Sequence, residues 1–373
     1  MKVAVVTESF LPQVNGVTNS VLRILEHFDR TGHEAVVIAP GPGDDRYGTA
    51  RVVRVPAVAL PVYRSFPVGL PSPRLATTLR SFQPDIVHLA SPAALGAVGA
   101  ATAHRLGLRS VAVFQSDLAG FARRYGAGVV APTLWRWLRW IHNHADLTLA
   151  PSSATAWELE RHGIAPVARW GRGVDAKRFH PQHRSETVCR HLAPRGETII
   201  GYVGRLAAEK QVDRLCALAD LPRTRLVIVG DGPERANLER RLPRAAFVGF
   251  RTGDDLSQLV ASFDVFVHPG EHETFCQAVQ EALASGVPVV APAAGGPLDL
   301  VHHDGNGFLF PAHDSAAMRS AVAALTKDPV RRLAMGVAAR HGVLGRSWSA
   351  LGDELLDHYR AVLGPAPRQV RAA

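Results

Sequence analysis

The feature that most constrains the fold is a regular alternation of short apolar runs with amphipathic helical patterns, which starts at residue 2 and restarts near residue 198. Short unbroken apolar runs are typical of strands buried in a parallel sheet. The first half predicts strands over 2–6, 35–39, 51–55, 86–89, 110–114 and, as the last one, 147–150, with helices over 17–28, 72–82, 93–106 and 152–162. Such alternation implies right-handed crossovers and a doubly wound sheet.

The second half repeats this organisation. It predicts strands over 198–203, 226–229, 246–248, 265–268 and 287–291, and helices over 211–220, 233–242, 254–262 and 274–285. The chain is therefore predicted to be α/β, with two Rossmann-like domains, 1–172 and 173–346. A helix over 347–363 is expected to pack back on the first domain, and the tail 364–373 to be disordered. Two facing domains leave a cleft along the carboxyl ends of both sheets, where ligands bind.

The positive charge is concentrated in the first half of the chain. Residues 1–186 carry 21 Lys/Arg against 13 Asp/Glu, a net +8, whereas residues 187–373 carry 21 against 20, a net +1. The first half is therefore expected to meet something anionic. Nucleic acid, a lipid headgroup surface and a phosphorylated substrate are all anionic partners that fit this expectation.

The cysteines and the apolar runs indicate the compartment. Three cysteines, Cys189, Cys216 and Cys276, form no paired spacing, which excludes a disulfide framework and suits a reducing cytosol. The start of the chain resembles a first strand more than a signal peptide, and the longest apolar run, 93–103, is too short to span a membrane. We expect a cytoplasmic protein, soluble or peripheral on the inner face of the plasma membrane.

The segment 269–296, PGEHETFCQAVQEALASGVPVVAPAAGG, carries the strongest functional signal. Glu273 precedes a predicted helix whose first turn holds Thr274, Phe275 and Cys276, and the amides of that turn suit a phosphate or a hydroxyl-rich group. Glu281 follows eight residues later, about 12 Å along a helix. The alternative is an ordinary helix-start acid followed by a solvated glutamate, but the apolar strand and Gly-Gly turn that follow favour a functional site.

This segment resembles the E-x7-E signature of the retaining GT-B glycosyltransferases of family 4, and other family motifs follow in order over nearly the whole chain. The resemblance implies a GT-B fold, a nucleotide-sugar donor, Glu273 on sugar hydroxyls and Glu281 on the ribose. The letters ETFCQ are closest to actinobacterial GDP-mannose-dependent α-mannosyltransferases that act on glycolipids. A lipid or glycolipid acceptor is then implied as the second partner.

A second motif, GYVGRLAAEKQVD at 201–213, places two cations beside a glycine at a strand end. Gly204, Arg205 and Lys210 can neutralise a diphosphate without a metal, and the resemblance gives them that role. A surface loop with ordinary basic residues is the alternative. No Asp-x-Asp occurs in the sequence, so we expect neither a metal nor another cofactor beyond the nucleotide-sugar co-substrate.

Two further glycines follow predicted strands. Gly16, in FLPQVNGVTNSV, is predicted in a tight turn before the first helix, where its amide can approach a phosphate or merely complete the turn. Gly230, in VGDGPERANLE, stands at a strand end that resembles the family's loop before the nucleobase region. Both are predicted to bind the donor.

One position departs from the family. Many relatives carry a histidine near the reacting sugar carbon after the strand equivalent to 111–114, and this chain has Gln115, Ser116 and Asp117 there. Asp117 is a candidate to orient or deprotonate the acceptor hydroxyl, and helix capping is its alternative role. The predicted catalytic set is Asp117, Arg205, Lys210 and Glu273.

The segment 121–146 interleaves indoles with arginines. Trp135, Trp137, Trp140, Arg123 and Arg124 are candidates for the acceptor site or for an anionic membrane surface. A helix packed on its own sheet, with tryptophan in the core, is the alternative that we favour for the helix as a whole.

The sequence thus predicts a retaining hexosyltransferase, and an α-mannosyltransferase that uses GDP-mannose in particular. A UDP-sugar-dependent enzyme is the alternative. A Rossmann dehydrogenase would need a Gly-x-Gly-x-x-Gly fingerprint after the first strand, and this sequence has a single glycine there. A nucleic-acid-binding protein would use the basic half but has no recognised reader motif, so no nucleic-acid partner is expected. A sugar-binding protein without turnover is the remaining non-enzyme alternative.

Overall fold

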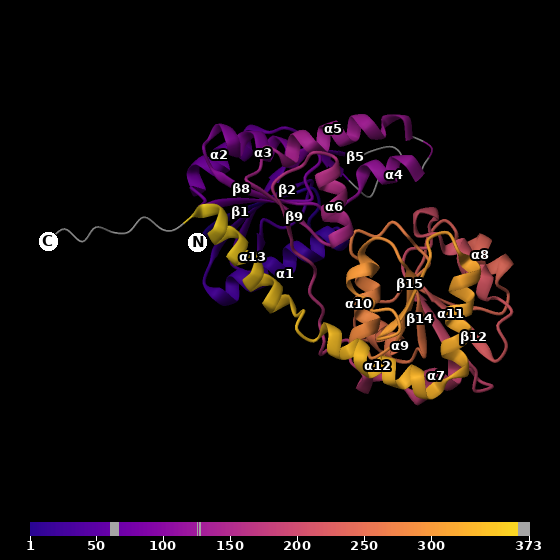
Figure 1. Ribbon diagram of the computed structural model, residues 1–373. Helices are drawn as coiled ribbons and strands as arrows, with labels where there is room; N and C mark the ends of the chain where they lie inside the picture. The colour runs from indigo at the N-terminus through magenta and orange to yellow at the C-terminus, as the bar shows by residue number, and fades with distance from the viewer. Residues whose placement is uncertain (60–66, 125, 127, 365–373) are drawn as a thin grey trace. The chain divides into compact units, whose positions relative to one another are not determined.

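The computed structural model describes residues 1–59, 67–124, 126 and 128–364, and the chain forms two units (Figure 1). The first unit comprises Met1–Pro151, Thr155–Gly171 and the chain from Trp348 onward. The second unit comprises Ser152–Ala154 and Arg172–Ser347. Each unit has a sheet and a core of its own. Apart from Gly364, the tail predicted to be disordered lies outside the described residues.

The first unit is built on a sheet of eight described strands in the order β10-β9-β8-β7-β1-β2-β4-β3. All neighbours are parallel except β3 and β4. The strands are β1 (Lys2–Thr7), β2 (Glu34–Pro40), β3 (Arg46–Tyr47), β4 (Ala50–Val55), β7 (Ile86–Ala90), β8 (Arg109–Val113), β9 (Leu147–Ala150) and β10 (Val167–Arg169), with β5 (Ala57–Ala59) and β6 (Pro67–Gly69) as a separate antiparallel pair.

Helices cover both faces of this sheet, as a doubly wound fold requires. They are α1 (Gly16–Thr31), α2 (Pro73–Phe82), α3 (Leu95–Arg105), α4 (Leu118–Arg124), the 3₁₀ turn η1 (Gly128–Val130), α5 (Ala131–His142) and α6 (Ser153–Arg161). The last helix of the chain, α13 (Trp348–Leu363), lies beside α1 and buries Leu351, Leu355, Leu356 and Tyr359 in the same core as Phe28 (Figure 1).

The second unit has a parallel sheet of six described strands in the order β13-β12-β11-β14-β15-β16. The strands are β11 (Thr198–Val203), β12 (Thr224–Val229), β13 (Ala246–Gly249), β14 (Val265–Val267), β15 (Val289–Pro292) and β16 (Gly307–Phe310). The surrounding helices are η2 (Pro181–His183), α7 (Glu186–Leu192), η3 (Ala208–Lys210), η4 (Val212–Leu218), α8 (Arg235–Arg241), α9 (Gly253–Ala261), α10 (Gln277–Ala284), η5 (Gly296–Asp299), α11 (Ser315–Lys327) and α12 (Pro329–Val343).

The strand order gives each sheet one topological switch point. In the first sheet the chain proceeds from β1 to β2 on one side and returns to β7 on the other. In the second sheet it proceeds from β11 to β12 and returns to β14. Loops that leave neighbouring strands in opposite directions open a crevice at the carboxyl edge, and ligands bind there in open α/β sheets. The loops after β1 and β7, and those after β11 and β14, are therefore the places to look for a site.

The predicted α/β class is confirmed, and most predicted elements are found within two or three residues of their expected ends. Three predictions are wrong. The strand over 147–150 is not the last one of its sheet, because β10 adds a further edge strand. The helix over 211–220 is a 3₁₀ helix, η4, and not an α-helix; Gln211, at φ +50°, separates it from the short 3₁₀ turn η3 that precedes it. The helix expected from 274 begins only at Gln277.

Candidate active site

The centre of the candidate site is a partly buried ion pair that spans the switch point of the second sheet. Lys210 ends η3 in the loop after β11, and Glu273 lies in the loop after β14. The Lys210 ammonium Nζ donates to Glu273 Oε1 at 2.6 Å, and only 14% of the Glu273 side chain is exposed. A short charge-assisted hydrogen bond in this position places a cation and a carboxylate side by side where ligands bind.

The surroundings keep both groups charged. Burial alone would raise the pKa of Glu273, but the Lys210 ammonium and the His268 imidazole hold it far below the usual range. Burial alone would lower the pKa of Lys210, and the Glu273 carboxylate raises it instead. The loop pair therefore presents an ammonium and an ionised carboxylate at neutral pH.

A histidine and an arginine complete this charge cluster. His268 follows β14 directly and lies with Nε2 at 3.4 Å from Glu273 Oε1. Burial alone would lower the pKa of His268, but the neighbouring Cys276 and Glu273 raise it to about 10. Burial lowers the pKa of Arg172 to about 10, and the guanidinium, which interacts with the Glu273 charge, stays protonated. Sequence reasoning missed both residues.

Glycines allow the neighbouring loops to approach closely. Gly230, after β12, has φ +137°, and a Cβ there would overlap the carbonyl oxygen of Gly204 after β11. The Gly204 amide donates to Val229 O at 3.0 Å, and the Gly230 amide donates to Gly249 O at 2.9 Å. Backbone therefore packs on backbone at the carboxyl ends of β11 and β12.

The Gly-Gly turn after β15 supports the Glu273 loop. The Gly296 amide donates to Glu273 O at 2.8 Å. Gly295 has φ +60°, and a Cβ on Gly296 would overlap the backbone of Phe275. Side chains at these two positions would push the 273–275 backbone away, so the turn fixes the position of Glu273. This contact explains why the Gly-Gly pair accompanies the glutamate in the sequence.

Arg205 lies on the same loop as Lys210 but makes different contacts. Its carbonyl accepts from the buried Tyr202 hydroxyl at 3.1 Å, and its Nη1 lies 3.6 Å from Glu209 Oε1. Its side chain is 49% exposed. The backbone of Arg205 is thus fixed by Tyr202, whereas its guanidinium lies on an open part of the loop.

Glu281 lies on α10 and is half-buried. Burial raises the pKa of Glu281 to about 7, although a hydrogen bond with Gln277 and the charge of Arg178 both favour its ionised form. A carboxylate that titrates near neutrality is sensitive to whatever binds beside it.

The residues between the two glutamates do not occupy a first helical turn. Cys276 has φ +75° and ψ +73°, a left-handed conformation, and α10 starts after it. The Phe275 side chain is 2% exposed and packs in the hydrophobic core, so only its backbone faces the loop. Thr274 is half-buried. The prediction that a helix start holds Thr274, Phe275 and Cys276 is therefore wrong, because the left-handed residue interrupts the helix.

One arrangement in the second unit has the composition of a metal site. The ligand atoms of His268, Glu273 and Cys276 lie within 4.8 Å of one another. Nitrogen, oxygen and sulfur donors of this kind suit zinc. The Lys210 ammonium, however, already bonds Glu273, so a divalent ion would have to compete with it.

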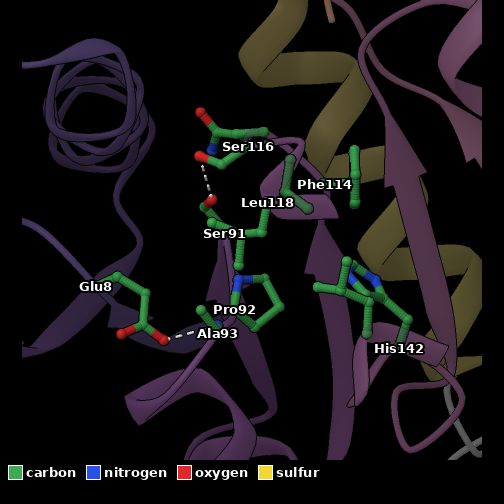
Figure 2. Close-up of a pocket in the computed structure, with 11 residues that line it drawn as sticks. Glu8, Ser91, Pro92, Ala93, Phe114, Ser116, Leu118 and His142 are labelled. Atoms are coloured by element: carbon green, nitrogen blue, oxygen red, sulfur yellow. Dashed lines mark hydrogen bonds between the residues drawn. The ribbon is translucent and has the colours of Figure 1, made fainter. Parts of the chain in front are cut away.

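In the first unit, Glu8 organises the switch point between β1 and β7. Its carboxylate accepts from the amides of Ala93, Leu95 and Gly96 at 2.7, 3.2 and 2.8 Å, at the start of α3. Figure 2 shows the bond with Ala93. Burial raises its pKa against the opposing effect of these bonds. The sequence analysis did not select Glu8, although an acid directly after the first strand was the available signal.

A small hollow of about 40 Å³ adjoins Glu8. Figure 2 shows Ser91, Ser116 and His142 around it, with the Ser91 hydroxyl 3.1 Å from that of Ser116. The side chain of Gln115 also lines it. In this structure the hollow is too small for a hexose and holds room for water only. Ser91, Gln115 and Ser116 lie just after the carboxyl ends of β7 and β8, within a mainly apolar lining.

Asp117 caps the helix that follows this hollow. Its Oδ1 accepts from the Gly120 amide at 2.7 Å at the start of α4, which is the capping role weighed from the sequence.

Gly16 is not in a separate turn: it is the first residue of α1, and the Asn15 side chain caps that helix by accepting from Val17 N and Thr18 N. Gly16 belongs to the first unit, whereas the other predicted donor-binding residues belong to the second.

The tryptophans of α5 divide into two groups. Trp135 is 5% exposed and stacks on His162 at 3.7 Å between ring centroids, so the prediction of Trp135 as a surface residue is wrong. It lies on the apolar face that packs against the sheet. Trp137 and Trp140 are 43% and 40% exposed and stack on each other at 5.2 Å. Arg123 and Arg124 belong to α4, but their side chains lie outside the described part of the structure.

Among the described residues, no helix combines the length and the apolarity that crossing a bilayer requires.

Two mainly parallel sheets, each with polar side chains at its switch point, and a partly buried ammonium–carboxylate pair in the second, form the arrangement expected of a GT-B glycosyltransferase. Comparison with known proteins agrees. Residues 14–178 match the model of glycosyltransferase family 4, and residues 184–342 match that of glycosyl transferases group 1. The chain belongs to this glycosyltransferase family.

Three similar proteins illustrate the relationship. A GDP-mannose-dependent alpha-mannosyltransferase of Mycobacterium tuberculosis is 53% identical over 98% of this chain and 97% of its own length. The protein of the same description from Mycolicibacterium smegmatis is 52% identical over the full length of both chains. The crystal structure of Anabaena HepE in complex with UDP has a TM-score of 0.78 at 21% identity, covering 96% of this chain and 99% of that one. The last similarity concerns the fold alone.

Proposed function

We propose that this protein transfers a mannosyl residue from GDP-mannose to a hydroxyl group of a lipid-linked or glycolipid acceptor, with retention of configuration. The donor and the sugar come from the descriptions of the relatives that are 52–53% identical over nearly the whole chain. The acceptor class and the retention are carried over from the family resemblance. Both belong to the proposal.

The observation that carries the proposed chemistry is the Lys210–Glu273 pair at the switch point of the second sheet. Departure of a nucleoside diphosphate builds negative charge on the β-phosphate, and fixed cations stabilise that charge without reorganisation. In the proposed complex, Lys210 and Arg205 hold the diphosphate and Glu273 accepts hydrogen bonds from the sugar hydroxyls. Glu281 accepts from the ribose, and the leaving phosphate takes the acceptor proton on the same face.

The reaction is proposed to need no metal. Lys210 already lies at 2.6 Å from Glu273, and Arg172 and His268 add positive charge around the same carboxylate. Turnover measured after dialysis against a chelator is expected to equal that of the untreated protein. Loss of turnover after dialysis that a divalent ion restores would overturn metal independence. If the ion no longer restores turnover in Cys276→Ala, it is assigned to the cluster of His268, Glu273 and Cys276.

The acceptor is proposed to bind the first unit. The hollow beside Glu8 includes the hydroxyls of Ser91 and Ser116 in a mainly apolar lining, and the exposed indoles Trp137 and Trp140 add an apolar surface. Indoles at this exposure suit a membrane interface, so the protein is proposed to be peripheral on the cytoplasmic face. Asp117 is proposed to affect binding of the acceptor substrate by capping and positioning α4. It is not proposed to take the proton from the acceptor hydroxyl.

A donor panel tests the proposed function. The protein is incubated with GDP-mannose, other GDP-sugars and UDP-sugars, with a crude membrane lipid extract as acceptor, and products are identified by mass spectrometry. Selective transfer of mannose from GDP-mannose to lipid is expected. Preference for a UDP-sugar would replace the donor while retaining the enzyme class. Absence of turnover with every donor, together with tight and strongly salt-dependent binding in a gel shift, would favour the nucleic-acid-binding alternative.

A further inference from the structure

A second anion-binding feature lies on the first unit, away from the switch-point loops of its sheet. A groove of about 660 Å³ runs between the edge strands β3 and β4 and the helix α2. Its lining combines apolar surface with guanidinium and hydroxyl groups, which belong to Arg46, Arg51, Arg54, Arg74, Thr77 and Ser81. Nothing in the proposed transfer reaction uses these residues.

The charge of this groove is not balanced by the protein. Arg46 and Arg51 are direct partners in the antiparallel register of β3 and β4, and both are exposed. Like charges opposite each other on neighbouring strands destabilise a sheet. Asp45 is the acid in the lining, and among the described residues no carboxylate lies within 4.0 Å of the guanidinium of Arg46 or Arg51.

Two other arginines fix the wall of the groove. Arg54 Nη2 donates to Leu11 O at 2.9 Å and to Asp44 O at 3.0 Å, and Arg74 Nη1 donates to Arg54 O at 3.0 Å. These bonds tie α2 and the loop before β3 to the strand β4. Arg54 and Arg74 are therefore held in place by backbone carbonyls, whereas Arg46 and Arg51 keep their donors for a ligand.

We propose that this groove binds a phosphoryl group. Guanidinium groups pair with phosphate oxygens through two parallel hydrogen bonds, and hydroxyls such as those of Thr77 and Ser81 add further ones. An anion seated between Arg46 and Arg51 would also remove the repulsion within the strand pair. The phosphoryl group is carried either by an anionic phospholipid headgroup or by a soluble phosphate ester, and the experiment separates these two sources. The proposal stands independently of the glycosyl transfer.

The test uses the full-length protein and two matched double variants. Arg46→Ala/Arg51→Ala removes two charges from the groove. Arg80→Ala/Arg240→Ala removes two exposed charges elsewhere, since Arg80 lies on α2 outside the lining and Arg240 lies on α8. Binding is measured by flotation with phosphatidylcholine vesicles with and without phosphatidylglycerol. It is also measured by calorimetry with glycerol phosphate and inorganic phosphate.

The groove variant is expected to bind its ligand roughly tenfold to thirtyfold more weakly than the parent, and the control variant to bind like the parent. A loss confined to phosphatidylglycerol vesicles assigns a lipid headgroup, and a loss with glycerol phosphate assigns a soluble ester. Phosphate is also expected to raise the thermal midpoint of the parent and not that of the groove variant. Turnover with a soluble acceptor is expected to be unchanged, which separates this result from a failure of the proposed function.

Equal binding by the parent and the groove variant, or equal losses in both double variants, would overturn the proposal, because the effect would then be absent or due to net charge alone. Loss of DNA binding alone in the groove variant would also overturn it and would assign the groove to nucleic acid.

Discussion

Lys210 and Arg205 are the residues on which the proposed chemistry depends most directly. Alanine at either position is expected to lower turnover by about 100-fold or more, because each removes a fixed positive charge from the diphosphate. Steady-state kinetics with GDP-mannose measures the effect. Lys177→Ala, at an exposed position of the second unit, serves as the control and is expected to behave like the parent. Near-parental turnover in both Lys210→Ala and Arg205→Ala would remove the diphosphate assignment.

Glu281 gives the protein a predicted pH dependence of stability. Its pKa in the folded protein, about 7, lies above the ordinary value of 4.5, so folding favours the protonated form. This contribution is fully present below about pH 4.5 and is lost as the pH rises through about 7. Glu281→Gln stays neutral, so at about pH 8 it is expected to be more stable than the parent by about 1 to 3 kcal/mol.

Unfolding of both proteins at about pH 5 and about pH 8 checks this prediction, with Glu160→Gln, an exposed glutamate on α6, as the control. Donor affinity is expected to change in the opposite direction, because a ribose diol donates to the carboxylate and not to the protonated acid. The parent should therefore bind donor more tightly as the pH rises through about 7, and Glu281→Gln should not. A parallel pH profile in the two proteins would contradict the assignment.

At the scale of elements, the close packing of strand-end loops is what makes the second sheet a binding surface. Gly230→Ala is expected to lower the free energy of unfolding by about 3 kcal/mol or more, since a Cβ at φ +137° would overlap the Gly204 carbonyl. Gly196→Ala is the matched control, with φ +70° and no atom near the new Cβ. It is expected to cost only about 1 kcal/mol of backbone strain. Chemical denaturation measures both, and equal losses would show that the loop contact is unimportant.

Element types follow local sequence except where a tertiary contact intervenes. The expected helix over 211–220 starts after Gln211, which is left-handed at φ +50° and whose side-chain oxygen accepts from the Glu271 amide at 2.8 Å. The helix of the glutamate motif starts late because Cys276 is left-handed. Through the Gln211–Glu271 bond, the loop after β14 contacts the segment after β11. The local periodicity of the sequence contains no information on such a contact between distant segments.

At the scale of the whole molecule, the C-terminal helix closes the N-terminal core. Tyr359 on α13 is fully buried, and its hydroxyl lies 2.7 Å from His88 Nδ1 on β7. Burial lowers the pKa of His88 to about 4, so the ring is neutral. Its Nδ1 makes one hydrogen bond with the Tyr359 hydroxyl, as acceptor or donor according to the tautomer. Tyr359→Phe is expected to destabilise the first unit by about 1 to 2 kcal/mol, because it leaves a buried ring nitrogen without its partner.

Thermal unfolding of the parent and the variant tests this, with Tyr47→Phe as the control. The Tyr47 hydroxyl donates to the partly exposed Glu26 at 3.0 Å, where water can replace it, so a loss below about 0.5 kcal/mol is expected. A larger loss in Tyr47→Phe than in Tyr359→Phe would contradict the role given to α13.

The sequence by itself determined the architecture and the chemical class of the second-unit site. Its repeated alternation of strand and helix predicts mainly parallel, doubly wound sheets, and its Lys210 and Glu273 stand in the segments that follow the predicted strands 198–203 and 265–268, where such sheets bind ligands. The tertiary structure alone decided which side chains meet. Lys210 and Glu273 are 63 residues apart, and their contact depends on β11 and β14 being neighbours. The inward position of Trp135, the capping of α3 by Glu8 and the facing of Arg46 with Arg51 were decided in the same way. Strand order and register are set by long-range packing, which a local pattern of residues does not contain.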